Sequence, residues 1–168
     1  MYWFACINAK RADPTFKNYR VNDLLNHFGD YHEPIPSILR ETVDESLLWN
    51  DIFDLKPIKN YAFQNILLIG DAAHATTPNM GQGACQAIED VVILIDEIKK
   101  NSGIRQAFKA FEERRIKRTH EIINMSWRIG KIAQLENSIL ASLRNFLFRR
   151  IPSSFNEKQL EKIYDVDF

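Results

Sequence analysis

Apolar and polar positions follow different patterns in the two halves of the chain. In the first half the apolar residues form short continuous runs at residues 2–8, 47–53 and 66–69. Runs of this length favour buried β-strands, and the run at 66–69 is fully apolar and ends directly at Gly70. We therefore predict three short strands in this half, with the 66–69 strand in the interior.

Short helices are predicted around the first two of these strands. A turn is expected at residues 12–14, and Asn22 is a suitable N-cap for a helix that ends near Gly29. A second short helix is expected over residues 37–42.

The second half is predicted to be helical. Residues 83–99 are apolar on most sides of a helix, which predicts a deeply buried helix. Apolar residues then recur with a period of about 3.6 over residues 104–130 and 139–147, which predicts two amphipathic helices. A last short helix is indicated by Leu160, Ile163 and Tyr164. The chain is thus expected to be α/β and rich in helix, although three short strands against several long helices is an odd ratio for a complete α/β domain.

Composition narrows the class of protein without assigning a function. The chain has 168 residues, 45% of them hydrophobic, with 22 basic and 22 acidic residues. These values are typical of a folded globular protein, and zero net charge disfavours nucleic acid as a partner. Cys6 and Cys85 are too few for a disulfide framework, so a cytoplasmic location is expected. No apolar run approaches the roughly 20 residues of a membrane-spanning helix.

The candidate chemistry lies between Ile66 and Asp90. Asp71 follows the end of a predicted buried strand, where α/β sheets bind ligands, and its carboxylate suits a sugar or polyol hydroxyl. Gly81 and Gly83 allow the backbone to approach a ligand closely. The helix predicted after them offers free N–H groups and a partial positive charge at its N-terminus. Together these features indicate a nucleotide-type cofactor site.

Simpler interpretations of the same residues stay open. Asp71 also suits capping of the next turn, and a GxG at 81–83 is only part of a GxGxxG fingerprint because Gln86 stands at its third position. His74 is interpreted as a structural, hydrogen-bonding histidine rather than a catalytic base. The charged run at 112–118 is interpreted as a solvated helix face with pairs four residues apart. No metal-ligand motif or Ser-His-Asp order stands out.

This stretch resembles a known family at more than a dozen positions. GDAAH at 70–74, PNMGQG at 78–83 and AIED at 87–90 resemble the second FAD-binding motif of the class A flavoprotein monooxygenases, relatives of para-hydroxybenzoate hydroxylase. The NMGQG and AIED sequences are most similar to those of the branch that contains salicylate hydroxylase, zeaxanthin epoxidase and the tetracycline-modifying enzymes. FEERR at 111–115, with Arg118, is similar to the Tyr-Glu-x-x-Arg helix of that family.

The resemblance implies a role for each matching residue. Asp71 would bind a ribityl hydroxyl of FAD, Pro78 would line the flavin face, and the glycine loop would hold the pyrimidine edge with the amides that follow it. The cofactor-binding residues implied are Gly70, Asp71, Pro78, Gly81, Gln82, Gly83, Ala84 and Cys85. The oxygen chemistry would belong to the flavin, so no side chain is assigned a catalytic role. The implied reaction is NAD(P)H-dependent insertion of one oxygen atom into a small organic, often aromatic, substrate, with Trp3 and Phe4 on a strand of the substrate-side sheet.

The resemblance also predicts a division of the chain. Members of the family are more than twice this length, and neither their GxGxxG nor their intermediate Asp-Gly motif occurs here. The chain is therefore expected to be the C-terminal part of such an enzyme, a helix-rich α/β (α+β) fragment of its Rossmann-like FAD/NAD(P)-binding fold. Residues 1–55 would be a remnant of the substrate-side sheet and its helices, residues 56–100 the strand, GD motif and helix of the FAD-binding domain, and residues 101–168 the C-terminal helices.

Partners follow from this division. The 168 residues alone are expected to bind FAD weakly or not at all and to be inactive. The missing N-terminal half is an expected partner, and exposed strands also favour dimerisation. The alternative function is a non-catalytic helical module that binds a protein partner or a separately encoded N-terminal half.

Overall fold

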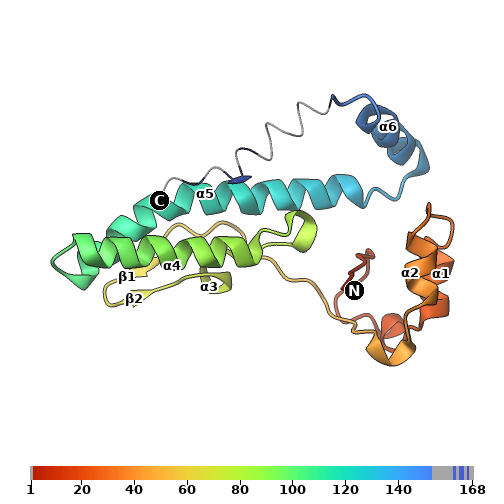
Figure 1. Ribbon diagram of the computed structural model, residues 1–168, viewed down its shortest axis with the longest axis horizontal. Helices are drawn as coiled ribbons and strands as arrows, with labels where there is room; N and C mark the ends of the chain where they lie inside the picture. Colours follow the sequence, from red (N-terminus) through yellow and green to blue (C-terminus); the bar gives the residue numbers. More distant parts are fainter. Residues whose placement is uncertain (1, 153–160, 162, 165, 167–168) are drawn as a thin grey trace. The chain divides into compact units, whose positions relative to one another are not determined.

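The computed structural model describes residues 2–152, 161, 163–164 and 166, and it divides into two compact units, Met1–Ile52 and Phe53–Phe168. Nearly all of its regular elements are helices (Figure 1). This confirms the predicted helix-rich fold. None of the helices in the described residues is long and apolar enough to cross a membrane.

The first unit is built from four short helical elements around a small core. They are the 3₁₀-helix η1 (Pro14–Asn18), α1 (Val21–Phe28), α2 (Ile35–Arg40) and the 3₁₀-helix η2 (Asp44–Ser46). Phe16, Leu24 and Leu39 are buried, and the ring of Phe16 stacks on that of Trp49 with centroids 4.6 Å apart.

Two predicted strands in this unit are wrong. Residues 2–8 and 47–53 are fully described, and neither is a strand. A strand needs a neighbour for its backbone hydrogen bonds, and side chains fix these segments instead. Trp3 Nε1 donates to Thr42 Oγ1 at 3.1 Å, and the Ala12 N–H donates to Asp51 Oδ2 at 2.9 Å. The strand implied for Trp3 and Phe4 is therefore absent.

The two predicted short helices exist with shifted ends. α1 begins at Val21, so Asn22 lies inside the helix and is not its N-cap. The Asp23 carboxylate accepts the N–H of Arg20 at 2.9 Å, which fixes the earlier start. α2 begins at Ile35, two residues before the predicted start, because proline is well tolerated in a first helical turn and Pro36 occupies that position.

The second unit carries a small hairpin and the long helices. Strands β1 (Ala62–Phe63) and β2 (Ile66–Leu67) pair antiparallel, with Ala62 opposite Leu67. They are followed by α3 (Asp71–His74), the 3₁₀-helix η3 (Pro78–Met80), α4 (Gly83–Lys100), α5 (Ile104–Ala133) and α6 (Ser138–Phe148). α4 packs along α5, to which it is joined by a three-residue connection (Figure 1). The helix predicted around Leu160 lies partly outside the described residues, of which Ile163 and Tyr164 are helical.

The predicted burial of this unit is partly wrong. The 66–69 strand is only two residues long, and Ile66 and Ile69 are 63% and 39% exposed. α4 has the predicted length, but most of its apolar side chains are exposed and its buried face is largely polar. The buried residues are Gln86, Glu89, Asp90, Ile93 and Glu97. The reason is α5, which presents matching polar side chains to this face.

A compact apolar cluster lies under the hairpin. Tyr61, Ala73, Ile93 and Phe111 are buried together, and Leu67 and Leu68 of the hairpin region pack against them. This cluster fixes the end of β2 onto α4 and α5 and thereby positions the GD segment.

Candidate functional site

The GD segment forms a sharp turn between β2 and α3. Gly70 has φ +55° and ψ −140°, a conformation that residues with a side chain rarely adopt. A Cβ on Gly70 would also lie 3.4 Å from the Cβ of Ala87 in α4. That is an ordinary van der Waals distance, so it is the backbone conformation that requires glycine here.

The Asp71 carboxylate is free at this turn. Asp71 is the first residue of α3, and its side chain is exposed and has no hydrogen bond or ion pair with another described residue. The N-cap of α3 is Gly70, without a side-chain cap. The interpretation of Asp71 as a capping residue is therefore wrong, and its oxygens are available to a ligand.

Asp90 holds both sides of the turn. Its Oδ2 accepts the Gly70 N–H and His74 Nε2, each at 2.7 Å. Burial opposes ionisation of Asp90, but the hydrogen bonds from His74 and Gly70 outweigh it and lower the pKa of the carboxyl. His74 is 2% exposed, so the prediction of a structural, hydrogen-bonding histidine is confirmed.

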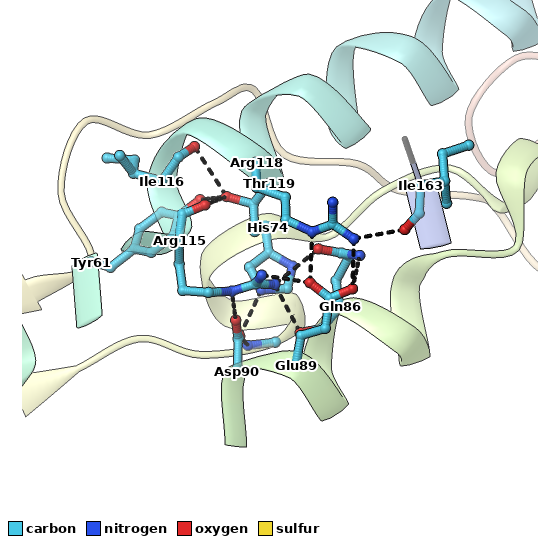
Figure 2. Close-up of polar contacts among 11 residues, drawn as sticks. Tyr61, His74, Gln86, Glu89, Asp90, Arg115, Ile116, Arg118, Thr119 and Ile163 are labelled. Atoms are coloured by element: carbon cyan, nitrogen blue, oxygen red, sulfur yellow. Dashed lines mark hydrogen bonds and ion pairs between the residues drawn. The ribbon is translucent and has the colours of Figure 1, made fainter. Parts of the chain in front are cut away.

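Arg115 of α5 completes a buried network with α4, shown in Figure 2. It is fully buried, and its Nε donates to Asp90 Oδ1 at 2.7 Å. Its Nη1 donates to Glu89 Oε2 at 2.6 Å, and its Nη2 donates to the backbone oxygen and Oε1 of Gln86 at 3.1 and 2.9 Å. Arg118 adds two bonds to Glu89, from Nε at 2.7 Å and from Nη2 at 2.9 Å. Burial opposes ionisation of Glu89 as well, but the two arginines lower its pKa.

The prediction that the charged run at 112–118 is a solvated face is therefore only partly right. Glu113 and Lys117 are exposed, but Glu112 and Arg115 are buried. Glu112 is 3% exposed and accepts the N–H groups of Tyr61 and Ala62 at 2.5 and 2.9 Å. Arg114 pairs across to Asp96 and Glu97 of α4. The available signal was the adjacent acid pair at 89–90, directly before the apolar run at 91–95, because buried carboxylates require cationic partners.

A second set of polar contacts anchors the loop before α4 onto α5. Ser126 Oγ donates to the Thr77 carbonyl at 2.7 Å, and its oxygen lies 2.8 Å from Thr77 Oγ1. Asn79 Nδ2 donates to Thr77 Oγ1 at 2.9 Å and to the Ser126 carbonyl at 3.1 Å. A Cβ on Gly130 would collide with the Asn79 side chain. Sequence reasoning missed these roles, and the one signal was a glycine within the apolar stripe of a long helix.

The loop ends at the N-terminus of α4. Gly81 is left-handed, with φ +63° and ψ 21°, and Gln82 is the buried N-cap. The first N–H groups of a helix, here those of residues 83–85, have no acceptor within the helix. Cys85 is exposed. Nearby, Thr76 Oγ1 is buried without a hydrogen-bond partner among the described residues, and its side chain lies beside Gly83.

The predicted site residues thus lie in the anchored segment from Gly70 to Gln82 and in the first turn of α4. Residue 70 packs on α4 at Ala87, and residue 76 lies beside Gly83, so the loop folds back onto the start of α4. Pro78 begins η3 between these contacts and is half-buried. The loop offers a free carboxylate, free N–H donors and an unpaired hydroxyl, a set that suits a polyol and the polar edge of a ring. These residues fit the ribityl and flavin part of FAD.

The fold and this loop define part of an FAD-binding domain, and comparison with known proteins agrees. The sequence profile described as "FAD binding domain" matches residues 30–125, more than half of the chain. The chain therefore belongs to this family of class A FAD-dependent monooxygenases, as its motifs predicted.

Its relatives are longer proteins. Aurachin C monooxygenase/isomerase of Stigmatella aurantiaca is 36% identical over 90% of this chain and 39% of that protein. The 2-heptyl-3-hydroxy-4(1H)-quinolone synthase of Pseudomonas aeruginosa (strain UCBPP-PA14) is 30% identical over 98% of this chain and 43% of that protein. Klebsiella pneumoniae HpxO, solved with FAD and uric acid, has the same fold over 85% of this chain and 37% of its own, with a TM-score of 0.75 and 23% identity. The chain thus spans about two fifths of the length of these relatives.

Proposed function

We propose that the chain supplies the ribityl and flavin-ring half of the FAD site of an NAD(P)H-using monooxygenase. The enzyme inserts one oxygen atom into a small organic, aromatic substrate. The observation that carries the proposal is the free Asp71 carboxylate on a turn that Asp90 holds from both sides. The Asp71 carboxylate is an exposed hydrogen-bond acceptor at the first residue of α3. Because it has no partner within the described part of the fold, it is available to bind a ligand.

Each of these residues contacts a different part of FAD. Asp71 accepts a hydrogen bond from a ribityl hydroxyl. The backbone at Gly81, Gln82 and Gly83, with the amides of Ala84 and Cys85, donates to the pyrimidine edge, and the N-terminus of α4 favours negative charge there. Gly70 makes the turn that presents Asp71, and Pro78 lines the flavin face. The flavin, when bound, supplies the redox and oxygen chemistry.

The names of two relatives suggest the substrates to test. One is named for a 2-heptyl-3-hydroxy-4(1H)-quinolone and another, from Polaromonas naphthalenivorans, is a 3-hydroxybenzoate 6-hydroxylase. A panel with a 2-alkyl-4-quinolone and a hydroxybenzoate therefore samples a neutral heteroaromatic ring and an aromatic acid.

A chimaera tests the function directly. The chain replaces the segment that it matches in the Stigmatella protein, and the purified chimaera is assayed for bound flavin and for substrate-stimulated NAD(P)H oxidation. We expect stoichiometric flavin in the chimaera and weak or no flavin on the 168 residues alone. A chimaera that is folded by circular dichroism and gel filtration but carries no flavin would contradict the proposal and favour a non-catalytic helical module.

A further inference from the structure

The loop between α3 and α4 is held onto α5 by three polar side chains, which we call the loop clamp. They are Thr77, Asn79 and Ser126. Ser126 is fully buried, and its Oγ donates to the Thr77 carbonyl at 2.7 Å and lies 2.8 Å from Thr77 Oγ1. The Asn79 amide donates to the Ser126 carbonyl at 3.1 Å. Each side chain of the loop clamp therefore bonds across from one element to the other.

The close approach of the loop depends on Gly130, which lies one turn after Ser126 in α5. A Cβ on Gly130 would collide with the Asn79 amide, so a larger residue there would move this amide away from the Ser126 carbonyl. A glycine within a helix costs about 1 kcal/mol relative to alanine. The helix is therefore less stable at the place where it accommodates the loop.

The same helix holds a second part of the site. Arg115 binds Asp90, and Asp90 accepts the N–H of Gly70 in the turn that presents Asp71. Ser126 follows Arg115 by eleven residues, which is about three turns of helix, or roughly 16 Å. Both residues therefore lie on one face of α5. The turn with the free carboxylate and the loop that leads to the N-terminus of α4 are attached to one continuous helix.

We propose that the loop clamp positions the flavin-binding loop relative to Asp71, so that its three members are positioning residues of the FAD site. They act through the backbone that follows them. Gly81 turns the chain in the left-handed conformation, and the first N–H groups of α4 come directly after it. This inference rests on the proposed function, because it concerns the alignment of these donors with Asp71 on the same ligand.

A purely structural role for the loop clamp would have a different consequence. The loss of a buried hydrogen bond would then affect the site only as far as it lowers the stability of the fold. Thr119 is the matched control, since it is a second buried hydroxyl on α5 and its Oγ1 lies 2.6 Å from the hydroxyl of Tyr61. Thr119→Val and Ser126→Ala each remove one buried hydroxyl from the same helix, but only Ser126→Ala releases the loop.

Amide hydrogen exchange of the 168-residue chain tests the loop clamp without flavin. The probe is the N–H of Gly81, which donates to the Pro78 carbonyl at 3.0 Å and exchanges when η3 opens. We expect Ser126→Ala and Asn79→Ala to speed this exchange by about fivefold or more, because each removes hydrogen bonds worth about 1 kcal/mol. Thr119→Val should leave the rate unchanged. A wild-type exchange rate in both clamp variants would overturn the inference.

The chimaera with the Stigmatella protein tests the effect on the cofactor. We expect Ser126→Ala to weaken FAD binding by about fivefold. At saturating FAD it should also make the reduction potential of the bound flavin more negative, because a helix N-terminus stabilises negative charge only when its N–H groups are directed at that charge. Thr119→Val should keep the wild-type affinity and potential.

Two outcomes of the chimaera experiment have different meanings. Equal losses of FAD affinity in Ser126→Ala and Thr119→Val, with the wild-type potential in both, would show that affinity follows stability and would overturn the inference. A wild-type chimaera that folds without flavin would contradict the proposed function instead. The exchange rate of Gly81 would then decide by itself whether the loop clamp orders the loop.

Discussion

Arg115 Nε and Asp90 Oδ1 lie 2.7 Å apart and join α5 to α4 through an ion pair that is fully buried on both sides. The other oxygen of Asp90 holds Gly70 and His74, the residues that flank the Asp71 turn. One carboxylate therefore connects the FEERR segment of α5 to the GD segment. The two sequence motifs that identify the family are, in the folded chain, parts of one polar network.

The ion pair predicts a strong effect of Arg115→Met on stability. Removal of one partner leaves Asp90 buried without its cation, which costs about 3–5 kcal/mol in comparable buried pairs. Urea unfolding of the chain, followed by circular dichroism, measures the loss. The control is Arg114→Met, because Arg114 is 29% exposed and pairs with the partly exposed Asp96 as well as with the buried Glu97; it should cost less, since solvent screens a partly exposed cation. Equal losses of unfolding free energy in the two variants would show that the buried network contributes no more to stability than the pairs of Arg114.

The lowered pKa of Asp90 predicts a loss of stability in acid. The folded chain binds the Asp90 proton less tightly than the unfolded chain does, so this carboxylate stabilises the fold at pH values above its unfolded pKa, about 4. That contribution is lost as the pH falls through the lower, folded pKa. Glu89 acts in the same direction.

The test of this pH dependence compares the wild type with Asp90→Asn. We expect the free energy of unfolding of the wild type to fall between about pH 5 and pH 2. Asp90→Asn should be less stable at pH 7 and should lose less on acidification, because asparagine does not titrate. Parallel pH profiles for the two proteins would rule out Asp90 as a source of the acid sensitivity.

The close approach of Asn79 to Gly130 predicts coupling between these two positions. Alanine is better than glycine within a helix by about 1 kcal/mol, so Gly130→Ala should stabilise α5 if there were room for its Cβ. In the wild type the Cβ meets the Asn79 side chain and should displace its two hydrogen bonds, each worth about 1 kcal/mol. In the Asn79→Ala background the same substitution should be stabilising. A double-mutant cycle by urea unfolding measures the difference, and additive effects would contradict the contact.

The helices were predictable from the sequence because their apolar residues repeat with the period of a helix. α4 and α5 have nearly the predicted bounds. The same periodicity led to a wrong prediction of which side chains of α4 are buried. It shows which residues share a face of the helix, but not which face another element covers. The face that α5 covers is polar because the buried carboxylates of α4 pair there with arginines of α5.

The two wrongly predicted strands, at residues 2–8 and 47–53, have a different explanation. Residues 2–8 are as apolar as a buried strand, but a strand exists only with a hydrogen-bonded neighbour, and a sequence does not indicate which neighbours are present. The motif residues were predictable because their spacing follows a recognisable family pattern. Ser126 and Asn79 were not, since a hydrogen bond between a loop and a distant helix leaves no periodic signal.

The affinity of the chimaera for FAD, with and without Asp71→Ala, tests the central claim most directly. Asp71 has no described partner in the fold, so Asp71→Ala should leave the unfolding transition unchanged. The loss of one hydrogen bond to the ligand should weaken FAD binding by about 1 kcal/mol, roughly fivefold in Kd. Glu113→Ala, which removes an exposed carboxylate from α5, is the control and should bind FAD as the wild type does. The account predicts weaker binding for Asp71→Ala alone, and an affinity equal to that of the wild type and Glu113→Ala would contradict it.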